Sequence, residues 1–587
     1  MTSLPIGRLA FFLLYLVDIS LQQSSAHWDE LNATVQGRLV RGIPLARPCF
    51  KLANGTGGDF NPDECSIVIQ DYLNEVVRID TFSAYIDTRS EICQATNSGC
   101  ILDTSMVNNS NAFDIPQVCS QGSIPEYAVD VRTTKDVLAS YKFSKTHSIP
   151  LVIKNTGAST MHNLQSISLN KTFVPYGCNS TPTAAVTFGA GVVTSSILDF
   201  AEANNITIPT ASDLTVGVAG GYLQLQFEVV TPSGLHVVTN NCQYPDLFFA
   251  LRGGGGGTFG TVLTVTTLAL PQLQVKTVEV SFSAAREDQE RFVKFMVDHT
   301  STAGILSFAN SILNSSRANE SIEPLRSYVT RELKGNFTFT VEPSYRSFFN
   351  KFQPAQPVGP GSALASRLVL LRNFESDVNR EELTRVVNGM LDAVDAMYLV
   401  ATTPFLYGES PGTSLTPAYR TALWHFIVAK EWKFNASVGE VSDAYKSVSD
   451  AIRPLREITA ESGAYQNEAD IYEPDFEVSF WGSNYEELLA IKKKYVSQVF
   501  GLTILFSRWV PRAASIRIHG SLKIHDVFED WKISYHASAN SLPCLGSQSF
   551  PRSPQTSALL LAMHADAISL WGTFRLQRPK GHNLPQY

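Results

Sequence analysis

The sequence predicts an α+β protein of several domains, and three observations support this fold class. The chain has 587 residues, enough for about two to four domains of the usual size. Its hydrophobic fraction of 44% and charged fraction of 17% are typical of globular proteins with large cores. From Glu126 onward, short runs of strand-forming composition alternate with runs of helical periodicity.

The first regular region covers residues 121–271 and has the length of one domain. It begins with a predicted strand at YAVDV, residues 127–131, and continues with a helix at TTKDVLASYKFSKTH, which has a threonine cap and one apolar face. The elements predicted after it are strands at 149–155 and 184–192, a helix at 195–205, a hairpin around the turn 232–234, a short helix at 245–252 and a strand at 261–270.

A second α+β region covers residues 272–460. Its predicted strands lie near 274–284, 335–342 and 366–373, and its predicted helices lie near 286–299, 380–397 and 440–453.

The last segment, residues 496–587, differs in composition from the rest. It contains nine Lys or Arg against four Asp or Glu, and five of the eleven histidines. Only residues 556–574 have the pattern of an apolar helix. The break indicates a domain boundary, a disordered tail, or a segment that did not evolve with the rest of the chain.

The overall charge argues against nucleic acid as the main partner. The formal net charge is −8, and the longest basic run is the three lysines of IKKKY. A nucleic-acid-binding domain is expected to carry a basic stripe or patch.

The N-terminus predicts secretion. Residues 1–26 combine Arg8, the apolar run LAFFLLYLV and a small residue, Ala26, as expected for a signal peptide, and the apolar run is too short for a stable membrane span. A signal anchor is the alternative. Ten Asn-x-Ser/Thr sequons fit a glycosylated extracellular protein, at Asn32, Asn54, Asn108, Asn170, Asn179, Asn205, Asn314, Asn319, Asn336 and Asn435.

The eight cysteines favour disulfides over a metal site, because none forms a C-x-x-C pair and seven precede residue 243. Residues 27–120 therefore form a predicted disulfide-containing segment. The first expected bridge is Cys93–Cys100, and the further candidates are Cys49–Cys65 and Cys178–Cys242.

Five consecutive glycines, Gly253–Gly257, stand between the predicted helix 245–252 and the predicted strand 261–270. Glycine permits positive φ and close approach to the backbone. A P-loop would need a lysine and a hydroxyl residue after the glycines, and a Rossmann fingerprint would need the order strand, glycines, helix. Neither condition is met. A structural turn and a site for a differently bound cofactor both remain open.

Several motifs in order resemble one family. They are PEYAVDVRTTKDV, IPLVIKNTG, AVTFGAGV, LTVGVAGGY, LQFEVVTPSG and DLFFALRGGGGGTFGTV, followed by AYQNEADIYEPDFEVSFWGSNYEELLAIKKKY at 464–495. Together they resemble secreted fungal FAD-linked oxidoreductases, the berberine-bridge-enzyme-like members of the vanillyl-alcohol oxidase superfamily. The resemblance covers residues from about 30 to 495.

The resemblance implies a two-subdomain FAD-binding domain of the PCMH (p-cresol methylhydroxylase) type at 121–271. It further implies a substrate domain with a large antiparallel sheet at 272–460 and a berberine-bridge-like terminal module at 461–495. FAD would lie between the two subdomains, with its diphosphate against backbone amides of the glycine-rich turns.

The resemblance also assigns site residues, and no metal is expected among them. Tyr465, in a Y-x-N pattern, is the implied catalytic base, and a core tyrosine with a satisfied hydroxyl is the alternative. The implied FAD-binding residues are Asn155, Gly157, Thr215, Gly217, Gly220, Gly221, Gly256, Gly257, Gly260, Val262 and Asn467.

The chain departs from the family at three places. The family continues after Gly157 with a histidine that usually carries the covalent flavin bond, whereas this chain has Ala158, and His162 is interpreted as an ordinary histidine. FAD is therefore expected to be bound noncovalently. A glycine-rich loop is missing after Gln224, and the sequence after Tyr495 is unlike the family. Without the backbone amides of these loops FAD would bind more weakly, because a buried phosphate charge needs hydrogen-bond donors. The clean interruptions of the family pattern suggest altered exon joining.

The implied chemistry is a two-electron oxidation of an alcohol or of a C–H next to a heteroatom, with hydride transfer to the flavin and dioxygen as the final acceptor. Sugars, phenols and secondary metabolites are the small-molecule substrate classes of such a family. Two other hypotheses stay open: an inactive or misassembled relative, and a secreted ligand-binding protein on the same scaffold.

Overall fold

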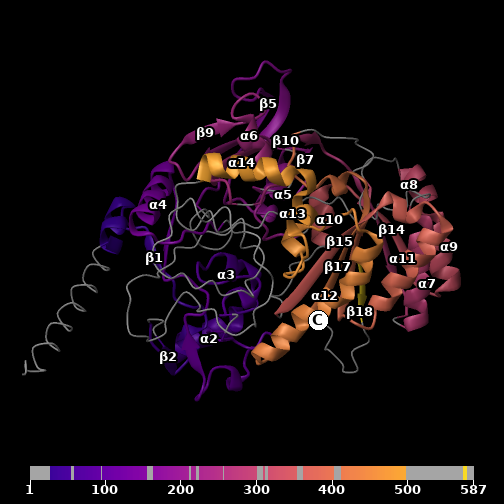
Figure 1. Ribbon diagram of the computed structural model, residues 1–587, viewed down its shortest axis with the longest axis horizontal. Helices are drawn as coiled ribbons and strands as arrows, with labels where there is room; N and C mark the ends of the chain where they lie inside the picture. The colour runs from indigo at the N-terminus through magenta and orange to yellow at the C-terminus, as the bar shows by residue number, and fades with distance from the viewer. Residues whose placement is uncertain are drawn as a thin grey trace, which may run out of the picture.

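The computed structural model describes thirteen stretches of the chain (Figure 1). They are residues 27–54, 58–93, 96–154, 163–210, 213–219, 224–255, 257–283, 285–300, 309–310, 315–352, 361–401, 412–496 and 573–577. Helices and antiparallel sheets occur in both halves, which confirms the predicted α+β class.

The N-terminal part has a small core of its own, built around two disulfides, Cys49–Cys65 and Cys100–Cys119. Strand β1 (Leu39–Arg41) pairs antiparallel with β4 (Tyr127–Val129), and β2 (Leu52–Asn54) pairs parallel with β3 (Val118–Ser120). Helices α2 (Pro62–Asp71) and α3 (Glu75–Ile79) each begin at an asparagine whose side chain accepts two backbone N–H groups.

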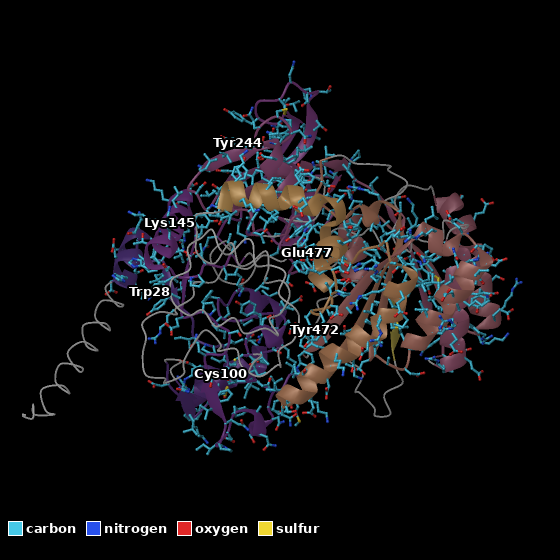
Figure 2. The ribbon with its side chains drawn as sticks, in the orientation of Figure 1. Trp28, Cys100, Lys145, Tyr244, Tyr472 and Glu477 are labelled. Carbon is cyan, nitrogen blue, oxygen red and sulfur yellow. A yellow bond between two sulfur atoms is a disulfide. The ribbon has the colours of Figure 1, made fainter. Side chains whose placement is uncertain are left out.

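Two of the three expected disulfides are confirmed, Cys49–Cys65 and Cys178–Cys242, and the predicted Cys93–Cys100 bridge is wrong. Cys100, labelled in Figure 2, pairs with Cys119. The Ser120 N–H donates to the Gly99 carbonyl at 3.0 Å, and this contact sets Cys119 beside Cys100. The spacing of the cysteines in the sequence contains no information about that contact.

A five-stranded antiparallel sheet forms the centre of the second part, in the order β5-β6-β10-β8-β9. Its strands are β5 (Ile167–Phe173), β6 (Thr183–Gly189), β8 (Gln224–Val230), β9 (His236–Thr239) and β10 (Thr261–Leu268). Helices α4 (Thr134–His147), α5 (Thr194–Ala203) and α6 (Pro245–Leu251) contribute buried residues to the same core. The predicted helix cap at Thr133 is present as a capping box with Asp136.

The strand predicted at 149–155 does not form in the described part of that segment. Leu151 and Ile153 are buried in the core, but residues 152–154 belong to no strand. Leu151 forms an isolated β-bridge, and the apolar pattern of the segment is explained mainly by its burial in the core.

The third part contains two further sheets, in the orders β13-β12-β14 and β15-β17-β16-β18. Their strands are β12 (Val275–Ser281), β13 (Ala309–Asn310), β14 (Asn336–Glu342), β15 (Ser362–Leu370), β16 (Ala396–Ala401), β17 (Ala422–Glu431) and β18 (Thr573–Gln577). Helices α7 (Arg286–His299), α11 (Asp377–Met390) and α12 (Val438–Ile458) share one core with β15 and β17. The short helices of this part are α8 (Ser315–Ser321), α9 (Glu323–Ser327) and α10 (Tyr345–Phe352).

Two predictions for this part need correction. The helix predicted at 380–397 ends at Met390, and its last residues belong to β16, whose sequence AMYLVA is apolar and suits a buried strand. β18 lies inside the compositionally different segment 496–587 and pairs with β16. The helix predicted at 556–574 lies outside the described residues except for its last two, which begin β18.

The C-terminal module joins the second and third parts. Helices α13 (Phe476–Trp481) and α14 (Tyr485–Val496) contribute Trp481, Leu488 and Ile491 to the core of the five-stranded sheet, and α14 lies below β5 in the upper half of Figure 1. The preceding segment lies along β15, where the Leu368 N–H donates to the Gly463 carbonyl at 2.8 Å. Among the described residues, none of the helices has the length and apolarity that crossing a bilayer requires.

Candidate active site

Tyr465 lies where the C-terminal module covers the outer edge of β15. Its backbone N–H donates to the Ser366 Oγ at 3.2 Å, and the Ser366 hydroxyl donates to the Tyr465 carbonyl at 3.4 Å. The side chain is only 6% exposed. These contacts with the Ser366 hydroxyl therefore fix where this ring enters the interior.

The predicted site residues Tyr465 and Asn467 are brought together. The Asn467 Nδ2 donates to the Tyr465 hydroxyl at 2.6 Å. Two further rings make T-shaped contacts with Tyr465, His425 at 5.4 Å and Tyr419 at 6.2 Å between ring centroids. A donor on the phenol oxygen favours its deprotonated form, so the arrangement can support a tyrosine that accepts a proton.

His425 was missed by sequence reasoning, because strand β17 was not predicted. Its Nε2 lies 3.4 Å from the Glu468 Oε2. Burial lowers the pKa of His425 to about 4, so the imidazole is neutral at neutral pH. Since the folded pKa is below the unfolded value, this histidine stabilises the fold above pH 6.5, and the stabilisation is lost as the pH falls toward 4.

Two glycine-containing segments each contact residues 190–193, the turn that follows β6 in the five-stranded sheet. Gly217 forms a bridge with Val193, and the Ala190 N–H, a few residues away, donates to the Leu263 carbonyl at 2.9 Å. Asp213 shapes the first segment, because its Oδ1 accepts from both the N–H and the hydroxyl of Thr215. Of the predicted FAD-binding residues, Thr215, Gly217, Gly257, Gly260 and Val262 lie in these two segments.

Asn467, the other predicted FAD-binding residue in the described part of the chain, lies beside Tyr465. Asn155, Gly157, Gly220, Gly221 and Gly256 lie outside the described residues.

The glycine run divides into two kinds of position. A Cβ at Gly253 would lie 2.5 Å from the Leu415 N, and one at Gly254 would lie 2.6 Å from the Ala250 O, so both glycines permit close packing. Gly255 has φ +110°, and a Cβ added there would meet nothing closer than 3.4 Å, while Gly257 has φ +66°. The positive φ of Gly255 explains why glycine suits this turn, and a Cβ there would make ordinary contacts with the side chains of Thr258 and Gln466.

The C-terminal module holds this glycine turn from the other side. The Lys492 Nζ donates to the Thr258 carbonyl, and the Gly253 carbonyl accepts from the Trp481 Nε1 at 3.2 Å and from the Gln466 Nε2 at 3.4 Å. Gln466 is the neighbour of Tyr465, so one short segment contacts both the glycine turn and the sheet edge. In the sequence, Lys492 is noticeable only as the first of three consecutive lysines in IKKKY.

Replacing Lys492 by methionine should change how stability depends on pH. Burial lowers the pKa of Lys492 to about 7. The unfolded lysine keeps its proton to much higher pH, so wild-type stability rises from pH 7 toward 10. The Lys492→Met variant lacks this rise. When the pH is lowered from 9 to 6, wild type should therefore lose on the order of a few kcal/mol of unfolding free energy relative to the variant. Urea unfolding at both pH values checks this, with exposed Lys493→Met as the control; parallel pH profiles of Lys492→Met and wild type would contradict it.

Comparison with known proteins shows which family the chain resembles. A model for "Berberine and berberine like" proteins matches residues 464–500. The FAD-linked oxidoreductase cheF of Chaetomium globosum is 29% identical over 519 residues, covering 80% of this chain and 84% of the relative. The VAO-type flavoprotein MtVAO615 of Myceliophthora thermophila superposes with a TM-score of 0.66 at 24% identity, covering 81% of this chain and 93% of the flavoprotein.

The chain is similar in sequence to berberine-bridge-like FAD-linked oxidoreductases and has the fold of the VAO-type flavoproteins, which supports an oxidoreductase. The comparisons also bear on the interruptions noted in the sequence. The FAD-linked oxidoreductase ffsJ of Aspergillus flavipes is 28% identical over 551 residues, covering 80% of this chain and 89% of ffsJ. The aligned length of 551 positions is greater than the number of residues in 80% of this chain. The alignment therefore contains gaps in this chain, and ffsJ has segments that this chain lacks.

Proposed function

We propose that this oxidoreductase binds FAD noncovalently and oxidises a small alcohol, sugar or secondary metabolite, with Tyr465 as the base and dioxygen as the final electron acceptor. The observation that carries the proposal is the place of Tyr465. It is a buried phenol that accepts a hydrogen bond from Asn467, beside a segment that also contacts the glycine turn. The family supports FAD as the cofactor.

Tyr465, Asn467 and His425 have different roles in the proposed reaction. Asn467 holds the Tyr465 hydroxyl and favours its anionic form, so that the phenol oxygen can take the proton of a substrate hydroxyl. His425 stays neutral and adds no positive charge beside the ring. FAD, when bound, supplies the two-electron oxidant. The amides near Gly217 and Gly257 would hold its diphosphate.

Noncovalent attachment is proposed from the sequence. Ala158 stands in the region where the family usually has its flavin-bearing histidine. The alternatives of an inactive relative or a ligand-binding protein are not favoured by the comparisons.

An extracellular location is part of the proposal. Eight of the nine described sequon asparagines are exposed, as glycosylation requires. The exception, Asn32, is half-buried and accepts the Leu39 N–H at 3.1 Å. The three disulfides that join pairs of described cysteines agree with an oxidising compartment.

The cofactor proposal is tested on the purified full-length protein. We expect flavin absorbance that passes into the supernatant on acid precipitation, and added FAD should raise the melting temperature of cofactor-stripped protein. At about 100-fold excess over Kd the gain corresponds to about 2.7 kcal/mol. Colour retained in the precipitate would contradict noncovalent attachment. A colourless protein that FAD does not stabilise would contradict the proposed function.

A further inference from the structure

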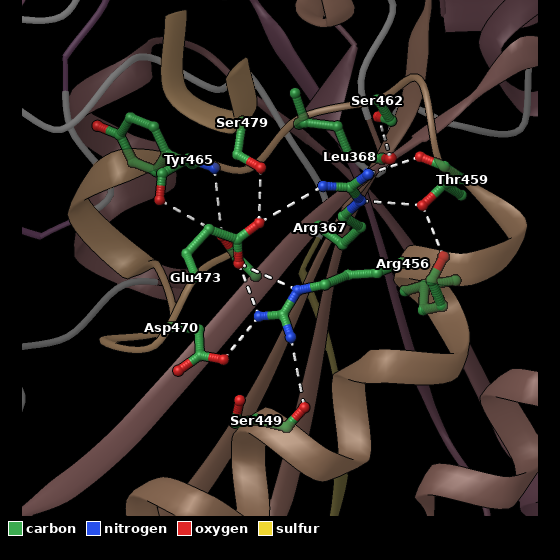
Figure 3. Close-up of polar contacts among 12 residues, drawn as sticks. Arg367, Leu368, Ser449, Arg456, Thr459, Ser462, Tyr465, Asp470, Glu473 and Ser479 are labelled. Atoms are coloured by element: carbon green, nitrogen blue, oxygen red, sulfur yellow. Dashed lines mark hydrogen bonds and ion pairs between the residues drawn. The ribbon is translucent and has the colours of Figure 1, made fainter. Parts of the chain in front are cut away.

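A cluster of four charged side chains is buried close to Tyr465 (Figure 3). The Arg456 Nη2 donates to the Asp470 Oδ2 and to the Glu473 Oε2, both at 2.6 Å. The Arg367 Nη1 lies 3.5 Å from the other carboxylate oxygen of Glu473. Glu473 therefore stands between two guanidinium groups, and the two positive charges match the two negative ones.

The cluster is completed by neutral partners. Arg367 also donates to Thr459, through Nε to the hydroxyl at 2.9 Å and through Nη2 to the carbonyl at 2.6 Å. The Ser479 hydroxyl donates to the Glu473 Oε1 at 2.8 Å. The side chains of Asp470 and Glu473 are 0% and 1% exposed. Burial lowers the pKa of Arg367 to about 10, so it is still charged at neutral pH.

Stability alone does not account for such a cluster. Removing charges from water is costly, and apolar side chains of similar volume often stabilise a fold as well as a buried ion pair does. Buried charges do impose one arrangement, because each displaced partner leaves an unpaired charge. The cluster is therefore expected to hold one particular arrangement of the chain around it.

The segment that carries Tyr465 is held by Ser366 at one end and by the cluster at the other. Ser366 of β15 binds the backbone of Tyr465 at one end of the segment, and its neighbour Arg367 binds Glu473 at the other end. Arg456 of α12 binds the segment at Asp470 and Glu473. The segment 465–473 is thus held at both ends by side chains from two rigid elements.

We propose that the Arg367–Glu473–Arg456–Asp470 cluster is a positioning device that sets the distance and orientation of Tyr465 toward the substrate. This inference rests on the proposed function of Tyr465. None of the four side chains is a catalytic residue; each acts through the segment that they hold.

The test uses full-length protein and four variants. Glu473→Gln keeps the shape of the side chain but leaves two buried arginines without its charge. Arg367→Met/Glu473→Gln removes one charge of each sign and guards against loss of folding. Arg453→Lys is the matched control, because Arg453 lies on the same helix in an exposed pair with Asp450. Tyr465→Phe reports on the base itself.

Two measurements separate the explanations. Hydrogen exchange of residues 464–475, followed by mass spectrometry, needs neither cofactor nor substrate. The second is kcat per bound flavin, with KM, using whichever compound of a benzylic-alcohol and sugar panel reduces the flavin fastest. For both cluster variants we expect exchange in 464–475 to rise at least about tenfold, and kcat per flavin to fall about 10- to 100-fold with KM nearly unchanged. Arg453→Lys should match wild type.

Three results would decide against the inference or against its premise. Unchanged exchange in 464–475 would overturn the positioning role. So would a general rise in exchange across α12 and β15 with constant kcat per flavin, which is the result of a merely stabilising cluster. Wild-type kcat in Tyr465→Phe would reject the proposed base instead, and the exchange data would still show whether the cluster orders the segment.

Discussion

Replacing Tyr465 by phenylalanine is expected to lower kcat by about 10²- to 10⁴-fold, the usual contribution of a positioned general base. The ring stays, so its edge contacts with His425 and Tyr419 are kept. Only the hydroxyl that accepts from Asn467 is lost. FAD content should be unchanged, and stopped-flow reduction of the bound flavin under anaerobic conditions measures the loss directly.

The matched control is Tyr472→Phe. Tyr472 belongs to the same module but is 41% exposed, and Figure 2 shows it near the middle of the molecule. Loss of the Tyr472 hydroxyl should change kcat by no more than a few-fold. If Tyr465→Phe also kept the wild-type rate, Tyr465 would be a core tyrosine with a satisfied hydroxyl, the other interpretation that its sequence pattern allows.

Local signals in the sequence predict much of the first half of the fold. The helix after Thr133 has a cap, an acidic residue three positions later and one apolar face, and the structure contains all three. Strand β17 gave no such signal. Its burial is almost continuous from Ala422 to Ala429, so the alternation that identifies a half-buried strand is absent. The sheet around His425 was therefore hidden from sequence reasoning.

The candidate site shows the same limit. Tyr465 and Asn467 are two residues apart, and a short motif carries both. The cluster partners of Glu473 come from β15 and α12, and Lys492 contacts Thr258 across more than two hundred residues of chain. Such contacts depend on tertiary packing, which neither periodicity nor spacing reports. The fold class is predictable here, and the contacts that tune the site are not.

Replacing Arg78 by methionine is expected to lower the free energy of unfolding by about 3–5 kcal/mol, the cost of leaving a buried charge without its partner. Arg78 and Glu91 form an ion pair whose two side chains are both 0% exposed. Arg78 also donates through Nε to the Tyr85 carbonyl at 2.6 Å and stacks on the Tyr72 ring. Urea unfolding followed by tryptophan fluorescence measures the loss.

Two variants make the interpretation specific. Arg78→Met/Glu91→Leu removes both charges and should recover most of the stability, because the cost comes from the unpaired carboxylate and not from the missing bond. Arg132→Met breaks an exposed pair with Asp130 and should cost less than about 1 kcal/mol. A double variant as unstable as Arg78→Met would show that packing of the Arg78 side chain, and not its charge, is what matters.

The effect of Arg78→Met should extend to cofactor binding. The segment that Arg78 holds supplies the carbonyls of Phe82 and Ala84, and both accept from the Lys154 Nζ at 2.8 Å. Lys154 directly precedes Asn155, a predicted FAD contact. Loosening the segment releases Lys154 from its acceptors, so FAD retention during gel filtration should fall in Arg78→Met and return in the double variant. Full retention in the single variant would mean that the N-terminal part and the cofactor site are independent.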